Sequence, residues 1–423
     1  MTIAVAIPAD RAECLGTLTS SFRAPALADT AIDEALNHPI RLNRAGPAVE
    51  ECILPGESVC LVVSDQTRPT AAHRVLPVLL KRLTGRGCKL SDFFILVATG
   101  IHRGPTPAEL SKILGRDMMA AFSGRIFIHD PDDEASLLSV GRTSRGHEVR
   151  LNRRAVEAQR LVLLGAASYH YYAGFGGGRK SLVPGLAARA TIAYNHSLTL
   201  DPQQDCIRAG VEIGRLDGNA VAEEMLEGAR LHPPDFIVNT VLTPAGQLAG
   251  VFAGDLDMAH RAACAFCERV DRIDLPRKAG FVVADASAAP NWIQAHKGLF
   301  NAARAVHSAG RVILLAPCPE GLGNERFRFF ITRGTLAEIF QLLRQNPEVN
   351  GQTALSTRLL GERAVLVTQL KERDAADLGI RTAPDLASAM EQALADFARA
   401  GNKRPTYYLM PEALKIVPFV EER

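Results

Sequence analysis

Short apolar segments recur along the chain, and each is followed by turn residues and then by a stretch with helical periodicity. The segments occupy residues 58–63, 93–98, 125–129, 161–164, 280–284, 311–315 and 364–367. Strands that are apolar on both faces are typical of parallel sheets covered by helices. The pattern therefore predicts an α/β fold with mostly parallel sheets flanked by helices.

A crossover helix is predicted between the first two strands. Pro69 suits the first position of a helix, because the N–H that proline lacks has no partner there. An apolar stripe at helical spacing follows and stops near two glycines. The stripe consists of Val75, Leu76, Leu79, Leu80 and Leu83, and the glycines are Gly85 and Gly87.

Length and a charge cluster predict two domains. The chain has 423 residues, whereas one domain usually has about 100–200. Asp, Arg and Lys residues cluster at 270–278, directly before the strand at 280. We therefore expect an N-terminal α/β domain at 1–272 and a C-terminal α/β domain at 273–423.

Composition and charge narrow the classes of function. Hydrophobic residues make up 47% of the chain and charged residues 22%, as in a folded protein with a sizeable core. Lys and Arg number 48 against 46 Asp and Glu, which excludes a nucleic-acid or anionic-membrane binder that relies on bulk charge. The first apolar run stops at Pro8, and no window holds about 18 uninterrupted apolar residues. We expect a cytoplasmic protein without nucleic acid or membrane as a partner.

The eight cysteines are scattered, which favours reduced, mostly buried thiols over a disulfide framework. Cys264 and Cys267 form a CxxC pair, but it lies inside the helix-like segment 258–272 and has no second pair. We interpret this pair as packing.

Polar residues gather where two strands end, and open α/β sheets bind ligands at the carboxyl ends of their strands. The sequence SDQTRPT at 64–70 places Asp65 and Arg68 before the predicted helix. This arrangement suits a carboxylate or phosphate ligand, but a helix cap with a surface arginine explains it equally well. The sequence ATGIHRG at 98–104 puts His102 on a turn, where an isolated histidine is usually only solvated.

A third strand end carries the most informative stretch, HYYAGFGGGRKSLVPG at 170–185. The glycines Gly176, Gly177 and Gly178 let the backbone approach a ligand closely, as phosphate loops do. A P-loop and a dinucleotide fingerprint both require glycine where Arg179 stands. The stretch is therefore neither of these motifs.

A lysine lies beside this glycine loop, with one histidine before it and another after it along the chain. Lys180 can act as a nucleophile or as a covalent attachment point. His170 and His196 can move protons or bind a metal of intermediate softness. The alternative is a plain phosphate loop with incidental histidines, although ordinary phosphate loops lack such histidines.

In the C-terminal domain, the sequence NWIQAHKGLF at 291–300 follows a strand and opens a helix. A lysine at a helix start, Lys297, would favour an anion, but such a lysine is more often a solvated surface residue. Gln294 and His296 fit either interpretation. Trp292 and Ile293 adjoin Gln294 and are expected to shape a pocket that favours an apolar substituent.

These ordered motifs resemble the lactate racemase family, whose members use a nickel-pincer nucleotide. The resemblance covers essentially the full length and rests on 64–70, 98–103, 170–185, 196 and 294–298. The HYYAGFGGGRK block is much more specific than an isolated glycine motif. The resemblance implies two domains with the active site in the interdomain cleft. It also implies that a segment near 365–395 crosses back to the first domain.

Matching the family's pattern position by position implies roles for individual residues. Lys180 would carry the pyridinium thioamide/thioacid mononucleotide through a thioamide, and His196 would be the protein ligand of nickel. The two catalytic acid/bases would be His102 and His170. Three residues would bind the substrate: Arg68, Lys297 and Gln294. Six would hold the cofactor: Lys180, Asp65, Gly176, Gly177, Gly178 and Arg179.

The family reaction accounts for these residue types. In racemisation of a 2-hydroxy acid, the α-hydrogen must leave and return on the other face. The family achieves this by hydride transfer: one histidine takes the hydroxyl proton, the pyridinium accepts hydride, and the flat 2-keto acid is reduced on its other face. Nickel with sulfur, carbon and sulfur donors and one imidazole suits a square-planar site.

The resemblance thus implies a racemase or epimerase of lactate or another short or apolar 2-hydroxy acid, matured by the enzymes that synthesise the pincer nucleotide. Two other classes compete with it. A pyridoxal-phosphate racemase also uses a lysine near a glycine-rich phosphate site, but it leaves His196 and the paired histidines without a role. A non-enzymatic nucleotide-binding protein would need Lys180 but neither His102 nor His170.

Overall fold

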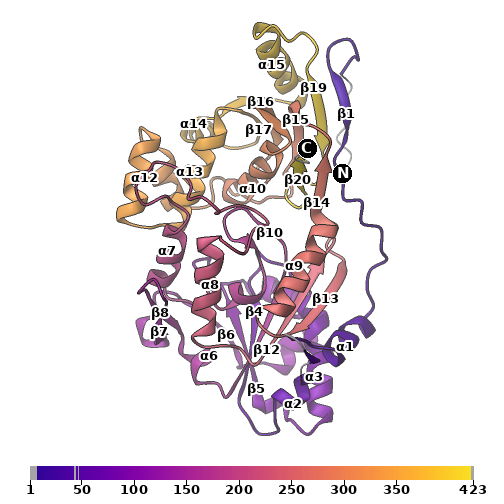
Figure 1. Cartoon of the computed structure of the whole chain (residues 1–423), viewed down its shortest axis with the longest axis vertical. Helices are drawn as coiled ribbons and strands as arrows, with labels where there is room; N and C mark the ends of the chain where they lie inside the picture. The colour runs from indigo at the N-terminus through magenta and orange to yellow at the C-terminus, as the bar shows by residue number, and fades with distance from the viewer. Residues whose placement is uncertain (1–6, 42–43, 46, 421–423) are drawn as a thin grey trace. The chain divides into compact units, whose positions relative to one another are not determined.

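The computed structural model describes residues 7–41, 44, 45 and 47–420, which form two compact units (Figure 1). The larger unit comprises Phe22–Thr199 and Ile207–Arg269. The smaller unit comprises Val270–Arg423 together with Met1–Ser21 and Leu200–Cys206. Each unit is built around its own sheet.

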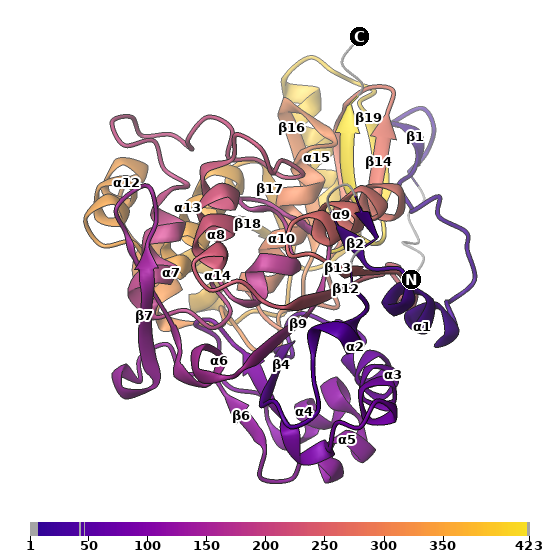
Figure 2. The same ribbon diagram turned by 60° about the horizontal axis from the view of Figure 1, so that its bottom comes forward.

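The larger unit contains an eight-stranded sheet in the order β3-β2-β13-β12-β9-β4-β5-β6. Figure 2 labels six of these strands, β2, β13, β12, β9, β4 and β6. Its five neighbouring strands from β12 to β6 are parallel, whereas β13 is antiparallel to β12, and β3 is antiparallel to β2. The strands are β2 (Ile40–Arg41), β3 (Arg44–Ala45), β4 (Val59–Ser64), β5 (Phe93–Ala98), β6 (Ile126–Ile128), β9 (Arg160–Ala166), β12 (Phe236–Leu242) and β13 (Leu248–Gly254).

Helices and two hairpins complete this unit. The helices are α1 (Thr30–Asn37), α2 (Val49–Cys52), α3 (Ala72–Gly85), α4 (Pro107–Leu114), α5 (Arg116–Ala121), α6 (Arg153–Glu157), α7 (Arg189–Ser197), α8 (Ala220–Arg230) and α9 (Met258–Asp271), with short 3-10 turns η1 (Leu90–Asp92), η2 (Glu134–Ser136) and η3 (Gly178–Ser181). The hairpins pair β7 (Leu137–Arg142) with β8 (Glu148–Asn152), and β10 (Tyr169–His170) with β11 (Gly174–Phe175).

The predicted apolar stripe forms one face of α3 and packs on the sheet. Its leucines lie in the same buried cluster as Leu61 of β4 and Ile95 of β5. The helix begins at Ala72, however, so Pro69 is not its first residue. Asp65 explains the difference, because its carbonyl and carboxylate accept the N–H groups of Arg68 and Thr67 and close a separate turn before the helix.

The smaller unit contains a six-stranded sheet in the order β1-β19-β15-β16-β17-β18, with every neighbouring pair parallel. These strands are β1 (Glu13–Thr17), β15 (Ala279–Asp285), β16 (Val306–Leu315), β17 (Ala364–Val367), β18 (Arg381–Ala383) and β19 (Thr406–Met410). Another parallel pair joins β14 (Arg272–Leu275) to β20 (Val417–Val420). The helices are α10 (Trp292–Ala303), α11 (Glu325–Ile331), α12 (Leu336–Gln345), α13 (Val349–Gly361), α14 (Glu372–Leu378) and α15 (Leu386–Arg399).

All seven predicted strands are present, with shifted ends in most cases. The division into units differs from the simple cut expected near 272, since β1 pairs with β19 and places the start of the chain in the smaller unit. The segment 365–395, for which a return to the first domain is expected, lies within the smaller unit, where β17 and β18 are neighbours. An apolar segment does not reveal which sheet it joins, because pairing is decided by contacts between distant residues.

Within the described ranges, no helix combines the length and the apolar character that a bilayer crossing requires.

Substitution of Phe281 in β15 tests how much this side chain contributes to the stability of the core in the smaller unit. Its ring is fully buried and stacks on Tyr407 of β19 with 5.0 Å between centroids. Phe281→Ala is expected to lower the free energy of unfolding by about 3–5 kcal/mol, because the lost apolar contacts leave a cavity. Urea unfolding followed by the fluorescence of Trp292, the single tryptophan of the chain, measures this loss. The control Phe329→Ala, at a ring that is 42% exposed, is expected to cost less than about 1 kcal/mol; equal losses would contradict the prediction.

Candidate active site

The glycine loop after β9 is held against the sheet at contact distances that leave no room for side chains. Gly177 and Gly178 have φ angles of +77° and +51°, which glycine adopts without strain. A Cβ on Gly178 would lie 2.7 Å from the His260 ring, and one on Gly177 would lie 2.9 Å from Oδ1 of Asn239. The glycines therefore serve close backbone packing within the larger unit.

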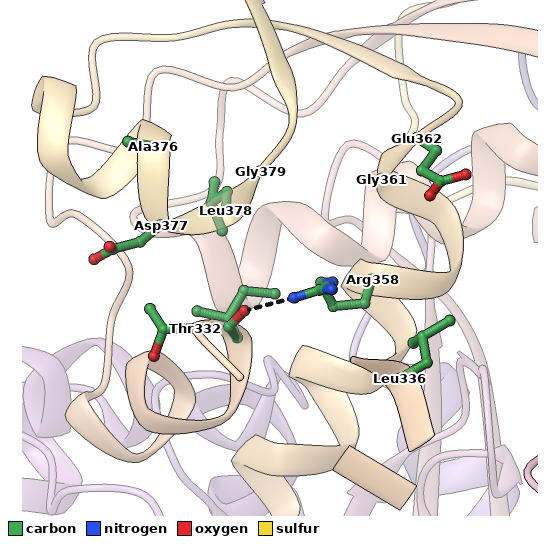
Figure 3. A pocket seen from close by; sticks show the side chains of 10 residues that line it. Thr332, Leu336, Arg358, Gly361, Glu362, Ala376, Asp377, Leu378 and Gly379 are labelled. Atoms are coloured by element: carbon green, nitrogen blue, oxygen red, sulfur yellow. Dashed lines mark hydrogen bonds between the residues drawn. The ribbon is translucent and has the colours of Figure 1, made fainter. Parts of the chain in front are cut away.

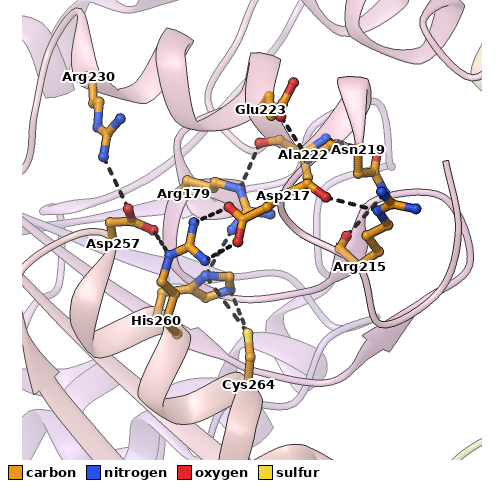
Figure 4. A network of polar contacts seen from close by, with 12 residues as sticks. Arg179, Arg215, Asp217, Asn219, Ala222, Glu223, Arg230, Asp257, His260 and Cys264 are labelled. Atoms are coloured by element: carbon orange, nitrogen blue, oxygen red, sulfur yellow. Dashed lines mark hydrogen bonds and ion pairs between the residues drawn. The ribbon is translucent and has the colours of Figure 1, made fainter. Parts of the chain in front are cut away.

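A buried polar layer lies beneath this loop, and Figure 4 shows two of its members, Arg179 and His260. Asn239 Oδ1 accepts the N–H of Gly178 at 2.7 Å. His260 Nε2 donates to the Gly176 carbonyl at 2.8 Å, and its Nδ1 accepts from Arg179 at 2.8 Å. These bonds connect β12 and α9 to three residues of the loop, Gly176, Gly178 and Arg179, so the loop has one defined position.

Arg179 belongs to this buried layer. Its Nε donates to the Ala222 carbonyl at 3.1 Å, and its Nη2 is buried without a hydrogen-bond partner in the described part of the chain. Burial lowers the pKa of Arg179 to about 10. Burial, followed by the charge of Arg179, lowers the pKa of His260 to about 3. At neutral pH the guanidinium is charged and the imidazole is neutral.

Lys180 follows in the short turn η3 and is only 7% exposed. Its N–H donates to the Gly177 carbonyl at 3.1 Å, and its carbonyl accepts the N–H of Gly185 at 3.0 Å. Its backbone is therefore fixed on both sides, which limits the positions that its amine can reach.

His196 lies near the end of α7, as the sequence predicts for a helix that starts after Ala188. Its Nδ1 donates to the Ile192 carbonyl at 2.8 Å, which leaves the lone pair on Nε2. Burial above all, with smaller contributions from the charges of Lys180, Arg68 and His102, lowers the pKa of His196 to about 4 despite the hydrogen bond to Ile192. The imidazole is therefore neutral, and the side chains of three predicted site residues are near enough to act on it.

Asp65 and His102 form a tight pair after β4 and β5. Asp65 is 2% exposed, and its Oδ2 lies 2.6 Å from His102 Nδ1. The other oxygen accepts the N–H and hydroxyl of Thr67 at 2.9 and 2.7 Å. Burial alone would raise the pKa of Asp65, but the hydrogen bond and charge of His102, with the charge of Arg68, outweigh it and lower that pKa. Asp65 thus orients His102, a contact that the predicted cofactor-holding role does not include.

His170 is the last residue of β10. Its Nδ1 accepts two backbone N–H groups, from Tyr172 at 3.3 Å and from Ala173 at 3.1 Å. The ring stacks on Tyr171 with 4.9 Å between centroids.

The remaining predicted residues belong to α10 of the smaller unit. Lys297 is the sixth residue of this helix, so it does not occupy the expected helix start. Its Nζ donates to Gln294 Oε1 at 2.6 Å. Trp292 is completely buried and donates to Thr357 at 3.2 Å, so it is a core residue and the expectation that it lines a substrate pocket is wrong.

A different hollow, of about 450 Å³, lies between α11, α13 and α14 (Figure 3). Arg358 lines it and donates to the carbonyls of Ile331 and Arg333 at 3.2 and 2.8 Å, which stabilises the end of α11. None of the predicted site residues lines this hollow. The Arg358 side chain, the cation that lines the hollow, therefore has structural partners.

Two positioning residues, Asn239 and His260, were not predicted from the sequence. Asn239 has a detectable signal, because it is the polar residue in the middle of the buried strand FIVNTVL. His260 has none, since a histidine one turn before Cys264 is unremarkable in an amphipathic helix. Cys264 and Cys267 are both buried, as the packing interpretation predicts. No cluster of three or more potential metal-ligating side chains occurs in the described ranges.

Gly178→Ala tests the close contact beneath the loop. The new Cβ meets the His260 ring at 2.7 Å in a left-handed backbone conformation. We expect a loss of unfolding free energy of about 2–5 kcal/mol, from about 1–2 for the conformation and about 1–3 for the clash. Thermal unfolding followed by circular dichroism measures it. In the matched control Gly246→Ala, the glycine has a φ of +82° and no atom lies within 4 Å of the new Cβ, so only the conformational cost applies. Equal losses of unfolding free energy in the two variants would argue against the close contact between Gly178 and His260.

His260 also predicts a pH dependence of stability. Its pKa is about 3 in the folded protein and about 6.5 when unfolded. The unfolded chain therefore binds the extra proton first, and stability falls as pH decreases below about 6.5, by up to about 1.4 kcal/mol per pH unit for this group. His260→Gln should reduce that slope between pH 6 and 4 in denaturant titrations. Replacement of the exposed His38 by Gln is the control, and an unchanged slope in His260→Gln would be evidence against the burial of a neutral imidazole.

Comparisons with known proteins identify relatives of this chain. The family model for the lactate racemase N-terminal domain matches residues 2–206. A lactate racemase from Lactiplantibacillus plantarum is 31% identical over 301 residues, which are 70% of this chain and 68% of that protein. Another, from Thermoanaerobacterium thermosaccharolyticum, is 27% identical over 401 residues, 92% of this chain and 91% of that protein.

Two solved structures share the fold. The lactate racemase apoprotein from Thermoanaerobacterium thermosaccharolyticum superposes with a TM-score of 0.83 at 24% identity and covers 99% of this chain and 97% of its own. A protein from Thermotoga maritima reaches a TM-score of 0.68 at 17% identity, over 95% of this chain and 100% of its own. On the strength of the sequence matches, this chain belongs to the lactate racemase family.

Proposed function

We propose that this protein is an isomerase that racemises lactate or another short 2-hydroxy acid, with a nickel-pincer nucleotide bound covalently to Lys180. The observation that carries the proposal is that Lys180, Arg68 and His102 lie near enough to the buried imidazole of His196 for their charges to lower its pKa. The names of the relatives support the reaction class.

The residues present fit such a cofactor. The Nε2 lone pair of His196 is the kind of donor that nickel accepts, and the hydrogen bond to Ile192 sets its direction. Lys180 offers an amine on a backbone that the glycine loop holds in place. Arg179 keeps a positive charge beneath that loop, where it favours a phosphate electrostatically.

When bound, the pincer nucleotide supplies a carbon that accepts the α-hydrogen as hydride and gives it back. The protein has to bind the substrate, remove the hydroxyl proton and keep the keto acid in place. His102 is suited to accept the hydroxyl proton. Asp65 accepts the hydrogen bond from its Nδ1–H, so the lone pair is on Nε2, where the ring can take up a proton. Asp65 also stabilises the positive charge that His102 gains.

Arg68 lies in the turn that Asp65 closes, near enough for its charge to lower the pKa of Asp65. Its planar guanidinium suits the carboxylate of a 2-hydroxy acid. Binding this carboxylate would hold the keto acid long enough for its other face to react. The substrate roles of Gln294 and Lys297, and the enzymes that synthesise the nucleotide as maturation partners, stay predictions from the family resemblance.

The decisive experiment is mass spectrometry of protein produced together with the enzymes that synthesise the pincer nucleotide. We expect a sulfur-containing nucleotide adduct on the peptide that contains Lys180, with nickel in the intact protein and racemisation of lactate. Lys180→Arg should carry neither adduct nor activity, because the guanidinium cannot form the thioamide. Racemisation by a protein without added mass at Lys180 would refute the covalent cofactor.

Two controls separate loading from catalysis. Lys112→Arg changes an exposed lysine of α4 and should keep both adduct and activity. His102→Ala should load normally but lose about 10²–10⁴-fold in rate, because general acid–base catalysis typically contributes that much. A double-digit percentage of activity in His102→Ala would remove His102 from the mechanism. Pyridoxal fixed to a lysine by borohydride would instead identify the competing cofactor.

A further inference from the structure

We infer that Asn195 is a positioning residue that fixes the backbone of His196, the proposed nickel ligand, relative to that of Lys180, the proposed attachment point of the nucleotide. The element between them is the first turn of α8, which binds the residue directly before each of these two. The inference rests on the proposed function and gives a role to a residue that the proposed reaction does not otherwise use.

Two neighbouring carbonyls of α8 accept hydrogen bonds from the site. Asn195 Nδ2 donates to the Val221 carbonyl at 3.0 Å. Arg179 Nε donates to the Ala222 carbonyl at 3.1 Å (Figure 4). Successive carbonyls of a helix are held at a fixed separation. Because the two donors directly precede the proposed metal ligand and the proposed attachment lysine, both backbone segments are set against the same rigid element.

Asn219 holds the first turn of α8 in place. Its side chain is fully buried, and its Oδ1 accepts the N–H groups of Val221 and Ala222 at 3.1 and 3.3 Å. Its Nδ2 donates to the Tyr172 carbonyl at 2.8 Å, in the turn between β10 and β11. This helix cap therefore fixes the two residues whose carbonyls accept the bonds from the site.

Asn195 supplies a tertiary hydrogen bond at the end of α7 where His196 lies. Near the start of this helix, the Thr191 hydroxyl donates to the Glu148 carbonyl at 3.3 Å and anchors the first turn. The bond from His196 to Ile192 lies within the helix, so it orients the ring on the helix but does not place the helix. The bond from Asn195 joins the last turn of α7 to α8 and sets the position of that turn.

The cost of burying this amide argues against a purely stabilising role. Asn195 is 1% exposed, and its Oδ1 has no hydrogen-bond partner within the part of the chain that the structure describes. A half-satisfied buried amide is less favourable than an apolar side chain of similar size. The Val221 carbonyl lies inside α8, where the helix supplies an N–H partner of its own. Loss of the amide should therefore leave the fold as stable as before or more stable, while it releases the last turn of α7.

Hydrogen exchange in the apoprotein tests the positioning role without any cofactor. Asn195→Leu keeps a similar volume but removes the donor. We expect the amides of residues 194–199 to exchange about two- to tenfold faster than in the parent, at an unchanged or higher Tm, because one modest hydrogen bond is lost. Asn195→Ala, which adds no atom, replaces this variant if leucine prevents folding.

Asn301→Leu is the matched control for this measurement. It removes another buried amide, which donates to the Ala413 carbonyl at 2.9 Å in the smaller unit. Exchange at residues 194–199 should stay as in the parent. Equal exchange at these residues in the parent and in the Asn195 variant would overturn the inference.

Protein loaded with the nucleotide tests the consequence for the metal. Asn195→Leu should carry the adduct at Lys180 to the same extent as the parent, because the bonds that hold the glycine loop are unchanged. Nickel should pass to added EDTA about 10–100-fold faster, because removing a group that orients a metal ligand typically weakens metal binding by that factor.

The outcomes separate this inference from the proposed function. Nickel retention equal to that of the parent, at equal adduct content, would show that Asn195 does not position His196. A parent that carries neither adduct nor nickel contradicts the proposed function instead. Hydrogen exchange in the apoprotein then still decides whether Asn195 fixes the last turn of α7.

Discussion

The close contact between the glycine loop and the residues beneath it is the constraint on which the site depends. Asn239 and His260 bind the backbone of Gly176 and Gly178 at 2.7–2.8 Å, and any Cβ on Gly178 would enter the His260 ring. Because the loop backbone is held in this way, the backbone of Lys180 has a defined position. The apolar strands β9 and β12 support the loop, and Asn239, a buried residue of β12, accepts a hydrogen bond from the loop backbone.

Electrostatics in this unit separates two kinds of histidine. Burial keeps His196 and His260 neutral, with pKa values of about 4 and 3, and nearby cations reinforce the effect. His102 instead has the carboxylate of Asp65 at 2.6 Å, which stabilises a positive imidazolium. A neutral imidazole can bind a metal or support a loop, whereas a ring beside a carboxylate can accept a proton. These histidines thus differ in electrostatic environment: two are buried and neutral, and one is paired with a carboxylate.

Much of the candidate site could be predicted from the chain, because its residues follow strands that are recognisable from apolar runs. Asp65, His102 and the glycine loop all come directly after such strands. The wrong predictions are those that inferred a residue's position in the structure from the local sequence pattern alone. Pro69 lies in a separate turn before α3, Lys297 lies in the middle of α10, and Trp292 is a core residue bonded to Thr357. In each case a turn or contact that the local pattern does not encode decides the position.

The sequence by itself determined the α/β architecture, the strands that end at the site and the identity of the reactive side chains, since these depend on local hydrophobic periodicity and on residue type. Only the tertiary structure decided that Asp65 orients His102, that His260 and Asn239 support the glycine loop, and that the start of the chain pairs with β19. These features join residues far apart along the chain. Hydrogen bonds of 2.6–2.8 Å depend on backbone positions that the whole fold sets, so no local pattern contains them.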